Sequence, residues 1–191
     1  MKVQDVMTKE VQTCRPETNL ADAAMRMWRN DCGALPVVAD GQKVVGVITD
    51  RDICMAGATK HRDQAGIRVE EVISGKVYSC PPDVDIHEAL KIMRKNQVRR
   101  LPIIDAEDGK LVGILSLNDI ALKEQGGAKA ELSAEDVEQT IRAICAHRTL
   151  PLAKQVPQTL AQVAIDETPM KTPTEERSTS SLHRLFGPAI R

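Results

Sequence analysis

The strongest constraint on the fold of this chain is an internal repeat that spans roughly its first two thirds. A shift of 66 residues superimposes like residues, pairing Val6 with Val72, Cys14 with Cys80, Pro16 with Pro82, Ala23 with Ala89, Met27 with Met93 and Pro36 with Pro102. The shift becomes 67 because residues 105–110 form a turn one residue longer than residues 39–43. Surface turns tolerate insertions, which supports the alignment. The sequence therefore predicts two copies of one structural unit.

Each copy contains an apolar pattern with the spacing of an amphipathic helix. The pattern consists of Leu20, Ala23, Ala24, Met27 and Trp28 in the first copy and of Ile86, Ala89, Leu90 and Met93 in the second. Asn19 precedes the first run and Asp85 the second, each with an acid three residues later. This arrangement is typical of a helix N-cap. We therefore expect helices that begin next to Asn19 and Asp85.

Two short runs rich in β-formers follow each helix, at residues 35–39 and 43–48 and at residues 101–105 and 110–115. A turn containing Gly41 or Gly109 joins each pair, which predicts two hairpins. A second helix should begin at Thr49 and at Ser116, and short strands at residues 11–13 and 77–79 should extend the sheets. Each copy then has the order β-α-β-β-α, and the fold class is mixed α+β. Because a half of about 55 residues cannot cover its own faces, the copies should pack as a pseudo-twofold pair.

The expected domain organisation follows from the repeat. It comprises a first repeat at 1–57, a connection at 58–68, a second repeat at 69–122, a linker and helix at 123–148, and a flexible tail at 149–191. Ser133 should open the last helix, which carries Val137, Ile141, Ile144 and Cys145 on one side. In the tail, residues 181–186 form an isolated apolar run. That run is either a segment that docks on a partner or an inert end.

Composition narrows the function classes. The chain has 26 basic and 27 acidic residues and only three aromatic side chains, so neither a strong basic field nor stacking platforms favour nucleic acid as a partner. No apolar stretch approaches the roughly 20 residues needed to span a membrane. The five cysteines show no CxxC spacing and no secretory signal precedes them, which favours a reducing cytoplasm.

A hydroxyl and an acid stand three residues apart at the start of each second helix, as Thr49 with Asp52 and as Ser116 with Asp119. A helix N-terminus favours phosphate, a hydroxyl can donate to it, and a carboxylate accepts hydrogen bonds from the diol of a ribose. The same spacing is also a capping box that needs no ligand. Recurrence in both copies favours a ligand. So does a glycine inside each preceding strand, Gly46 or Gly113, which would let a ligand approach the backbone.

The segments LPVV and LPII, together with GVITDRDI and GILSLNDI, resemble those of a tandem pair of cystathionine β-synthase (CBS) domains, also called a Bateman module. The resemblance covers residues 1–122. It implies two related sites for AMP, ATP or another adenosyl ligand in a cleft between the repeats, and no other cofactor. It also implies a disc-shaped homodimer and regulation of a protein partner that the sequence does not identify.

The resemblance assigns roles to matching residues of this chain. Asp52 and Asp119 would hold ribose, and Thr49 and Ser116 phosphate or ribose. Adenine would lie against the backbone of residues 13–15 with 35–37, and of 79–81 with 101–103. The complete set of expected ligand-binding residues is Thr13, Cys14, Leu35, Pro36, Val37, Thr49, Asp50, Arg51, Asp52, Ser79, Cys80, Arg99, Arg100, Leu101, Pro102, Ile103, Ser116, Asn118 and Asp119.

The copies differ at matched positions, since Arg51 faces Asn118, and Gly33-Ala34 face Arg99-Arg100, so the two sites should not be equivalent. The basic cluster consists of Arg94, Lys95, Arg99 and Arg100. It has three interpretations: a solvated face, phosphate donors for the cleft, or a small nucleic-acid patch.

No set of residues in the sequence indicates catalysis or metal binding. The four histidines lack metal-ligand spacing, and no nucleophile is paired with a base. Cys14 and Cys80 are interpreted as core residues rather than as a redox pair. The leading hypothesis is a non-enzymatic energy or adenosyl sensor. The alternatives are an interaction module whose motif residues serve only as helix caps and, least favoured, an enzyme that uses the cleft as its active site.

Overall fold

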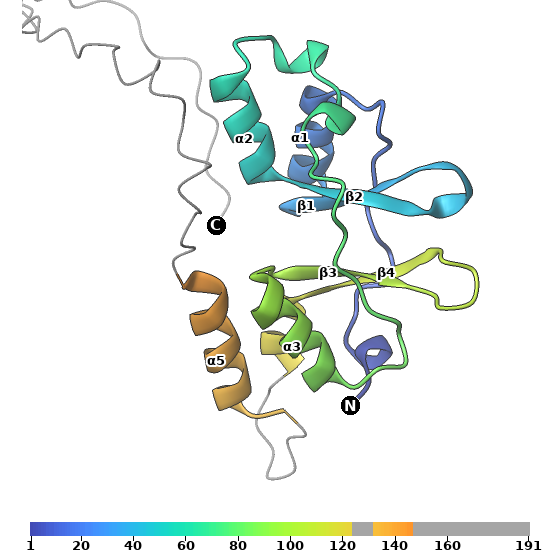
Figure 1. Cartoon of the computed structure of the whole chain (residues 1–191), viewed down its shortest axis with the longest axis vertical. Helices are drawn as coiled ribbons and strands as arrows, with labels where there is room; N and C mark the ends of the chain where they lie inside the picture. The colour runs from blue at the N-terminus through green and yellow to red at the C-terminus, as the bar shows by residue number, and fades with distance from the viewer. Residues whose placement is uncertain (124–131, 147–191) are drawn as a thin grey trace, which may run out of the picture. The chain divides into compact units, whose positions relative to one another are not determined.

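The computed structural model describes residues 1–123 and 132–146, and the expected tail at 149–191 lies outside them (Figure 1). The elements are α1 (Leu20–Arg29), β1 (Ala34–Val38), β2 (Val44–Thr49), α2 (Asp50–Thr59), α3 (Ile86–Asn96), β3 (Arg100–Ile104), β4 (Leu111–Ser116), α4 (Leu117–Lys123) and α5 (Ala134–Cys145). Short 3-10 turns occur at Val3–Asp5, Asp40–Gln42, Gln64–Gly66 and Val69–Glu71. Within these ranges no helix is long and apolar enough to cross a membrane. We call the copy with α1, β1, β2 and α2 repeat 1, and the copy with α3, β3, β4 and α4 repeat 2.

The predicted helices and hairpins are confirmed. The Asn19 side chain accepts from the Asp22 N–H and caps α1, and Asp85 caps α3 by accepting from the His87 N–H. Strand β1 pairs antiparallel with β2, and β3 with β4, as two separate two-stranded sheets. Gly41 and Gly109 have φ angles of 70° and 72°, a conformation that glycine adopts readily, and this explains their place in the turns.

The short strands expected at residues 11–13 and 77–79 are absent from the structure. A single parallel bridge takes their place in each repeat, Cys14 with Val37 and Cys80 with Ile103. In both repeats the pairing cannot continue beyond the bridge, because the residue two positions on, Pro16 or Pro82, would be the next donor and has no N–H. Each sheet therefore stays two-stranded, with one extra residue bonded at its edge.

The two hydrophobic cores exchange segments between the repeats. The N-terminal segment, residues 1–8, belongs with the core of repeat 2, where Val3 is fully buried and Val6 nearly so. The connecting segment, residues 67–73, instead packs against the core of repeat 1 through the fully buried Ile67 and Val69. The region expected to be an irregular connection thus ends in core residues. The N-terminal segment thus completes the core of repeat 2, and the matching connecting segment completes the core of repeat 1.

Backbone hydrogen bonds repeat this exchange at matched positions. The Val3 N–H donates to the Val84 carbonyl at 3.0 Å, and the matched Val69 N–H donates to the Thr18 carbonyl at 2.8 Å. Thr8 also forms an antiparallel bridge with Ile114 of β4 through two bonds of 2.9 Å. The exchange is therefore fixed by main-chain pairing as well as by apolar burial.

Gly46 and Gly113 have a packing role that differs from the one expected. A Cβ at Gly46 would lie 2.6 Å from Ile73 Cδ1, and a Cβ at Gly113 would lie 2.6 Å from Met7 Sδ. The exchanged segments thus occupy the space beside both glycines. The sequence predicted that a ligand could approach the backbone at both glycines. This prediction is wrong, because the side chains of Ile73 and Met7 already occupy the space beside them.

Two predicted apolar faces are wrong in part. Trp28 does not belong to the buried stripe of α1 but is 84% exposed, because Leu20, Ala23 and Met27 already define the buried side. On α5 the buried residues are Val137 and Thr140, with Ile144 against the same core. The expected Ile141 and Cys145 are exposed instead. Helix α5 packs beside α3 of repeat 2 (Figure 1).

Candidate ligand-binding site

The first predicted pair, Thr49 and Asp52, lies where β2 ends and α2 begins. Asp52 Oδ2 accepts from the Thr49 N–H at 3.0 Å and from the Thr49 hydroxyl at 2.7 Å. The Asp52 N–H donates to Thr49 Oγ1 at 3.2 Å. The hydroxyl and the carboxylate are both half-buried and bonded to each other, so the pair forms a closed capping box.

The second pair, Ser116 and Asp119, has nearly the same geometry between β4 and α4. Asp119 Oδ2 accepts from the Ser116 N–H and from the Ser116 hydroxyl, both at 2.7 Å. The Asp119 N–H donates to Ser116 Oγ at 3.1 Å. The sequence repeat thus produces a repeated local structure, in which the capping bonds use Oδ2 of each carboxylate and leave Oδ1 outside the box.

The expected adenine-contacting segments come together in each repeat. The Cys14 N–H donates to the Pro36 carbonyl at 3.1 Å, and the Cys14 carbonyl accepts from the Val38 N–H at 2.9 Å. In repeat 2 the Cys80 carbonyl accepts from the Ile104 N–H at 3.1 Å. Thr13 and Ser79, half-buried, directly precede these bridges.

Several side chains of the predicted set point into the cores. They are Leu35, Val37, Leu101 and Ile103, fully buried, with Cys14 and Cys80 also buried. A ligand can reach these six positions only through their backbone. Pro36 and Pro102 are buried too, but they alternate with the core residues along β1 and β3 and so face the other side of each sheet. Burial raises the pKa of the Cys14 thiol to about 11, against a weaker opposing effect of Arg26, and raises that of Cys80 to about 11. Because the thiolate is disfavoured, both cysteines are poor nucleophiles.

The four basic residues that the sequence groups together do not form one patch. Arg94 donates from Nη1 to Thr140 Oγ1 at 3.2 Å, so it serves the docking of α5. Lys95 and Arg99 are exposed, whereas Arg100 is half-buried. Arg100 reaches from the start of β3 toward the loop before β1, where a Cβ at Gly33 would lie 3.3 Å from its Nη2.

The same loop receives the carboxylate of Asp50. A Cβ at Gly33 would lie 3.0 Å from Asp50 Oδ2, and the Asp50 N–H donates to the Gly33 carbonyl at 3.3 Å. Asp50 and Arg51 are exposed in the first turn of α2, and Asn118 is exposed in the first turn of α4. The structure thus places side chains from both repeats at the start of α2.

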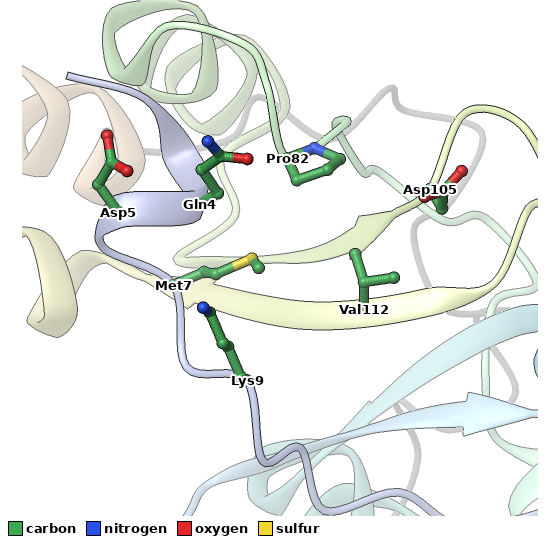
Figure 2. A pocket seen from close by; sticks show the side chains of 7 residues that line it. All are labelled: Gln4, Asp5, Met7, Lys9, Pro82, Asp105 and Val112. Atoms are coloured by element: carbon green, nitrogen blue, oxygen red, sulfur yellow. The ribbon is translucent and has the colours of Figure 1, made fainter.

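A hollow of about 440 Å³ lies beside the N-terminal segment and β4, and none of the predicted residues lines it (Figure 2). It is lined by Gln4, Asp5, Met7 and Lys9 on one side and by Pro82, Asp105 and Val112 on the other. It is wide open, and its charged residues differ in sign. No sequence pattern indicates this hollow, since it depends on how the exchanged N-terminal segment packs. Among the described residues, no group of three His, Cys, Asp or Glu side chains is placed to hold a metal.

The fold and the paired motif define a duplicated α+β module with one hydroxyl–carboxylate pair per repeat. The CBS domain family model matches residues 3–58 and 69–125, and the chain belongs to this family. The CBS domain-containing protein YhcV of Bacillus subtilis is 37% identical over 128 residues, which cover 67% of this chain and 89% of that protein.

Two similar solved structures carry adenosyl ligands. The CBS domain pair of protein MJ0100 is described in complex with 5′-methylthioadenosine and S-adenosyl-L-methionine. It has a TM-score of 0.59 and 25% identity, covering 64% of this chain and 94% of that chain. CBSX2, described in complex with AMP, has a TM-score of 0.56 and 26% identity, with the same coverage of 64% and 94%.

Proposed function

We propose that this chain is a non-catalytic regulatory module that binds an adenosine nucleotide between its two repeats and signals occupancy to a protein partner. The observation that carries the proposal is the repeated hydroxyl–carboxylate pair, Thr49 with Asp52 and Ser116 with Asp119. Family membership supports it, as do the adenosyl ligands of MJ0100 and CBSX2. All five cysteines are free, which supports a reducing cytoplasm as its location.

One observation favours a second function, a non-catalytic interaction module without a nucleotide. Both motif acids already have capping partners, and each motif hydroxyl accepts from one first-turn amide, that of Asp52 in α2 and that of Asp119 in α4. A third box, Ser133 with Asp136 on α5, has the same bonds, with the Ser133 hydroxyl donating to Asp136 Oδ2 at 2.6 Å. Capping alone therefore explains such geometry at one position outside the proposed site.

Replacement of the motif acids separates the two functions. We expect AMP or ATP at a hundredfold excess over Kd to stabilise the wild type by about 2.7 kcal/mol, because it binds only the folded state. Asp52→Ala and Asp119→Ala should each lower the affinity of one site by about ten- to a hundredfold, since a charged acceptor for the ribose is lost. Calorimetric titration with both nucleotides measures the affinities.

Asp136→Ala is the matched control, because it removes an acid from a box with the same bonds on α5. Denaturant melts should show a loss of roughly 1 kcal/mol for each of the three variants, the cost of a lost cap. Only Asp52→Ala and Asp119→Ala should also lose affinity. If neither nucleotide binds the wild type at millimolar concentration, the interaction module becomes the better account.

We also propose that the chain forms a homodimer through the helices of repeat 1. Trp28 and Met25 on α1 are 84% and 48% exposed, and Met55 on α2 is 52% exposed. Large apolar side chains exposed together are typical of an interaction surface. At the matched position in repeat 2, Arg94 bonds to α5 of the same chain, so α5 lies on the corresponding face there.

Trp28→Glu should therefore weaken the dimer by at least tenfold, because a charge replaces a large apolar anchor. Light scattering between micromolar and hundred-micromolar concentration should give twice the chain mass of 20.9 kDa for the wild type. Leu122→Glu serves as a control on repeat 2, since Leu122 is also exposed, at 70%. A wild type that remains at 20.9 kDa, with and without nucleotide, would contradict the dimer.

A further inference from the structure

Helix α5 contacts α3 at successive levels through polar side chains on α3 or at its end. In order along α3 these are His87, whose Nε2 lies 3.7 Å from Asp136 Oδ2, Arg94, whose Nη1 donates to Thr140 Oγ1 at 3.2 Å, and Gln97, whose Nε2 donates to the carbonyls of Ala143 and Ala146 at 3.1 and 3.0 Å. Residue numbers rise together along both helices, so the helices run parallel. These contacts fix the position of α5 on α3.

Between these polar contacts the interface is buried. Leu90 of α3 is fully buried, and Val137 of α5 is 8% exposed and belongs to the same buried cluster. Thr140 has no exposed surface, and its hydroxyl also donates to the Asp136 carbonyl at 2.7 Å. Helix α5 therefore covers a face of α3 that we call the α3 face, formed by His87, Leu90, Arg94 and Gln97.

The shift of 66 residues places the α3 face on a matching face of repeat 1, formed by Ala21, Ala24, Trp28 and Asp31. Helix α5 does not cover this matching face, and Trp28 within it is 84% exposed. Trp28 also belongs to the surface through which we propose that the homodimer forms. The chain thus presents one copy of this face to solvent and covers the other copy with its own helix.

We propose that the α3 face is a second self-association surface, which binds the same face of another copy when α5 leaves it. The inference rests on the proposed homodimer. The occupant is a second copy because both faces derive from one repeated unit, and the exposed one is assigned to self-association. A twofold axis would bring two α3 faces together, with Leu90 as the apolar anchor. Helix α5 belongs to the same chain, so its effective concentration exceeds that of a second copy and keeps the α3 face covered.

The test isolates the α3 face. Trp28→Glu removes the apolar anchor of the repeat 1 surface, and Thr140→Asp adds a charge at a fully buried position of α5 without altering α3, so α5 should leave α3. Light scattering should give 20.9 kDa for Trp28→Glu and twice that mass for Trp28→Glu with Thr140→Asp. Hydrogen exchange should show that amides of Ala134–Cys145 lose protection while those of α3 keep it.

Two further variants identify the surface that pairs. Val137→Asp in place of Thr140→Asp puts the charge at another buried position of α5 and should double the mass in the same way. Leu90→Ala, added to Trp28→Glu with Thr140→Asp, should weaken the new dimer by at least about tenfold, because the apolar anchor is lost. Alanine suits this position, since the matched residue of repeat 1 is Ala24.

Gln139→Asp on the Trp28→Glu background is the matched control, because it adds the same charge to the exposed neighbour on α5 and should leave the mass at 20.9 kDa. A doubled mass for this control would overturn the inference, since it does not uncover α3. So would an unchanged mass for Trp28→Glu with Thr140→Asp when exchange shows that α5 has left α3. The proposed homodimer fails separately, if the wild type is a single chain, and a doubled mass on release of α5 would then still support the α3 face.

Discussion

Deleting residues 1–8 should abolish the cooperative folding of repeat 2, although these residues precede repeat 1 in the sequence. The deletion removes Val3 and Val6 from the core of repeat 2 and uncovers the face beside Gly113 that Met7 fills. Burial of each such side chain contributes roughly 1.5 to 3 kcal/mol, so the loss is about 5 kcal/mol. That is comparable with the whole stability of an average domain, about 5 to 15 kcal/mol.

Hydrogen exchange would locate the effect, because amides of α3, β3 and β4 should lose protection before those of α1 and β1. A point variant makes the same test without shortening the chain. Val3→Asp places a charge in a fully buried position, whereas Gln4→Asp adds the same charge to the exposed neighbour. Only Val3→Asp should destabilise repeat 2. A deletion variant that unfolds within about 1 kcal/mol of the full chain would show that the exchanged segment contributes little.

The sequence predicted the elements better than it predicted their contacts. Helical spacing, N-caps and turn glycines are local signals, and the helices and hairpins they indicated are present. The repeat alignment matched Val6 with Val72 but could not tell which copy each would cover, since both copies offer an equivalent apolar face. Trp28 was misplaced for a related reason, because helical spacing shows which residues share a face but not how wide the buried part is.

The candidate site was predicted through its motif and less well through its surroundings. Thr49 and Asp52 stand three residues apart, so their geometry follows from helix formation alone. Arg100 and Asp50 are 50 positions apart in the sequence and meet only because the repeats pack against each other. The unequal matched residues at these positions were the one available signal. They indicated unequal sites without saying which repeat would receive the cation.

Leu90→Ala should destabilise the chain by about 2 to 5 kcal/mol, because a fully buried leucine is replaced and its neighbours relax only in part. Leu90 lies on α3 in the same buried cluster as Leu132 and Val137 of the α5 region. The matched residue in repeat 1 is Ala24, which is half-buried on a helix that α5 does not cover. The larger side chain in repeat 2 therefore fills the space that the docked helix encloses.

Thermal and denaturant melts should show a fall in Tm on the order of 10 °C for Leu90→Ala, given the size of the described body. Leu122→Ala is the matched control, since it makes the same chemical change at a side chain that is 70% exposed and should cost less than about 0.5 kcal/mol. Loss of α5 docking would also raise amide exchange in Ala134–Cys145 for Leu90→Ala alone. Equal effects of the two variants would mean that α5 does not enclose Leu90, because an open site leaves no cavity to penalise the shorter side chain.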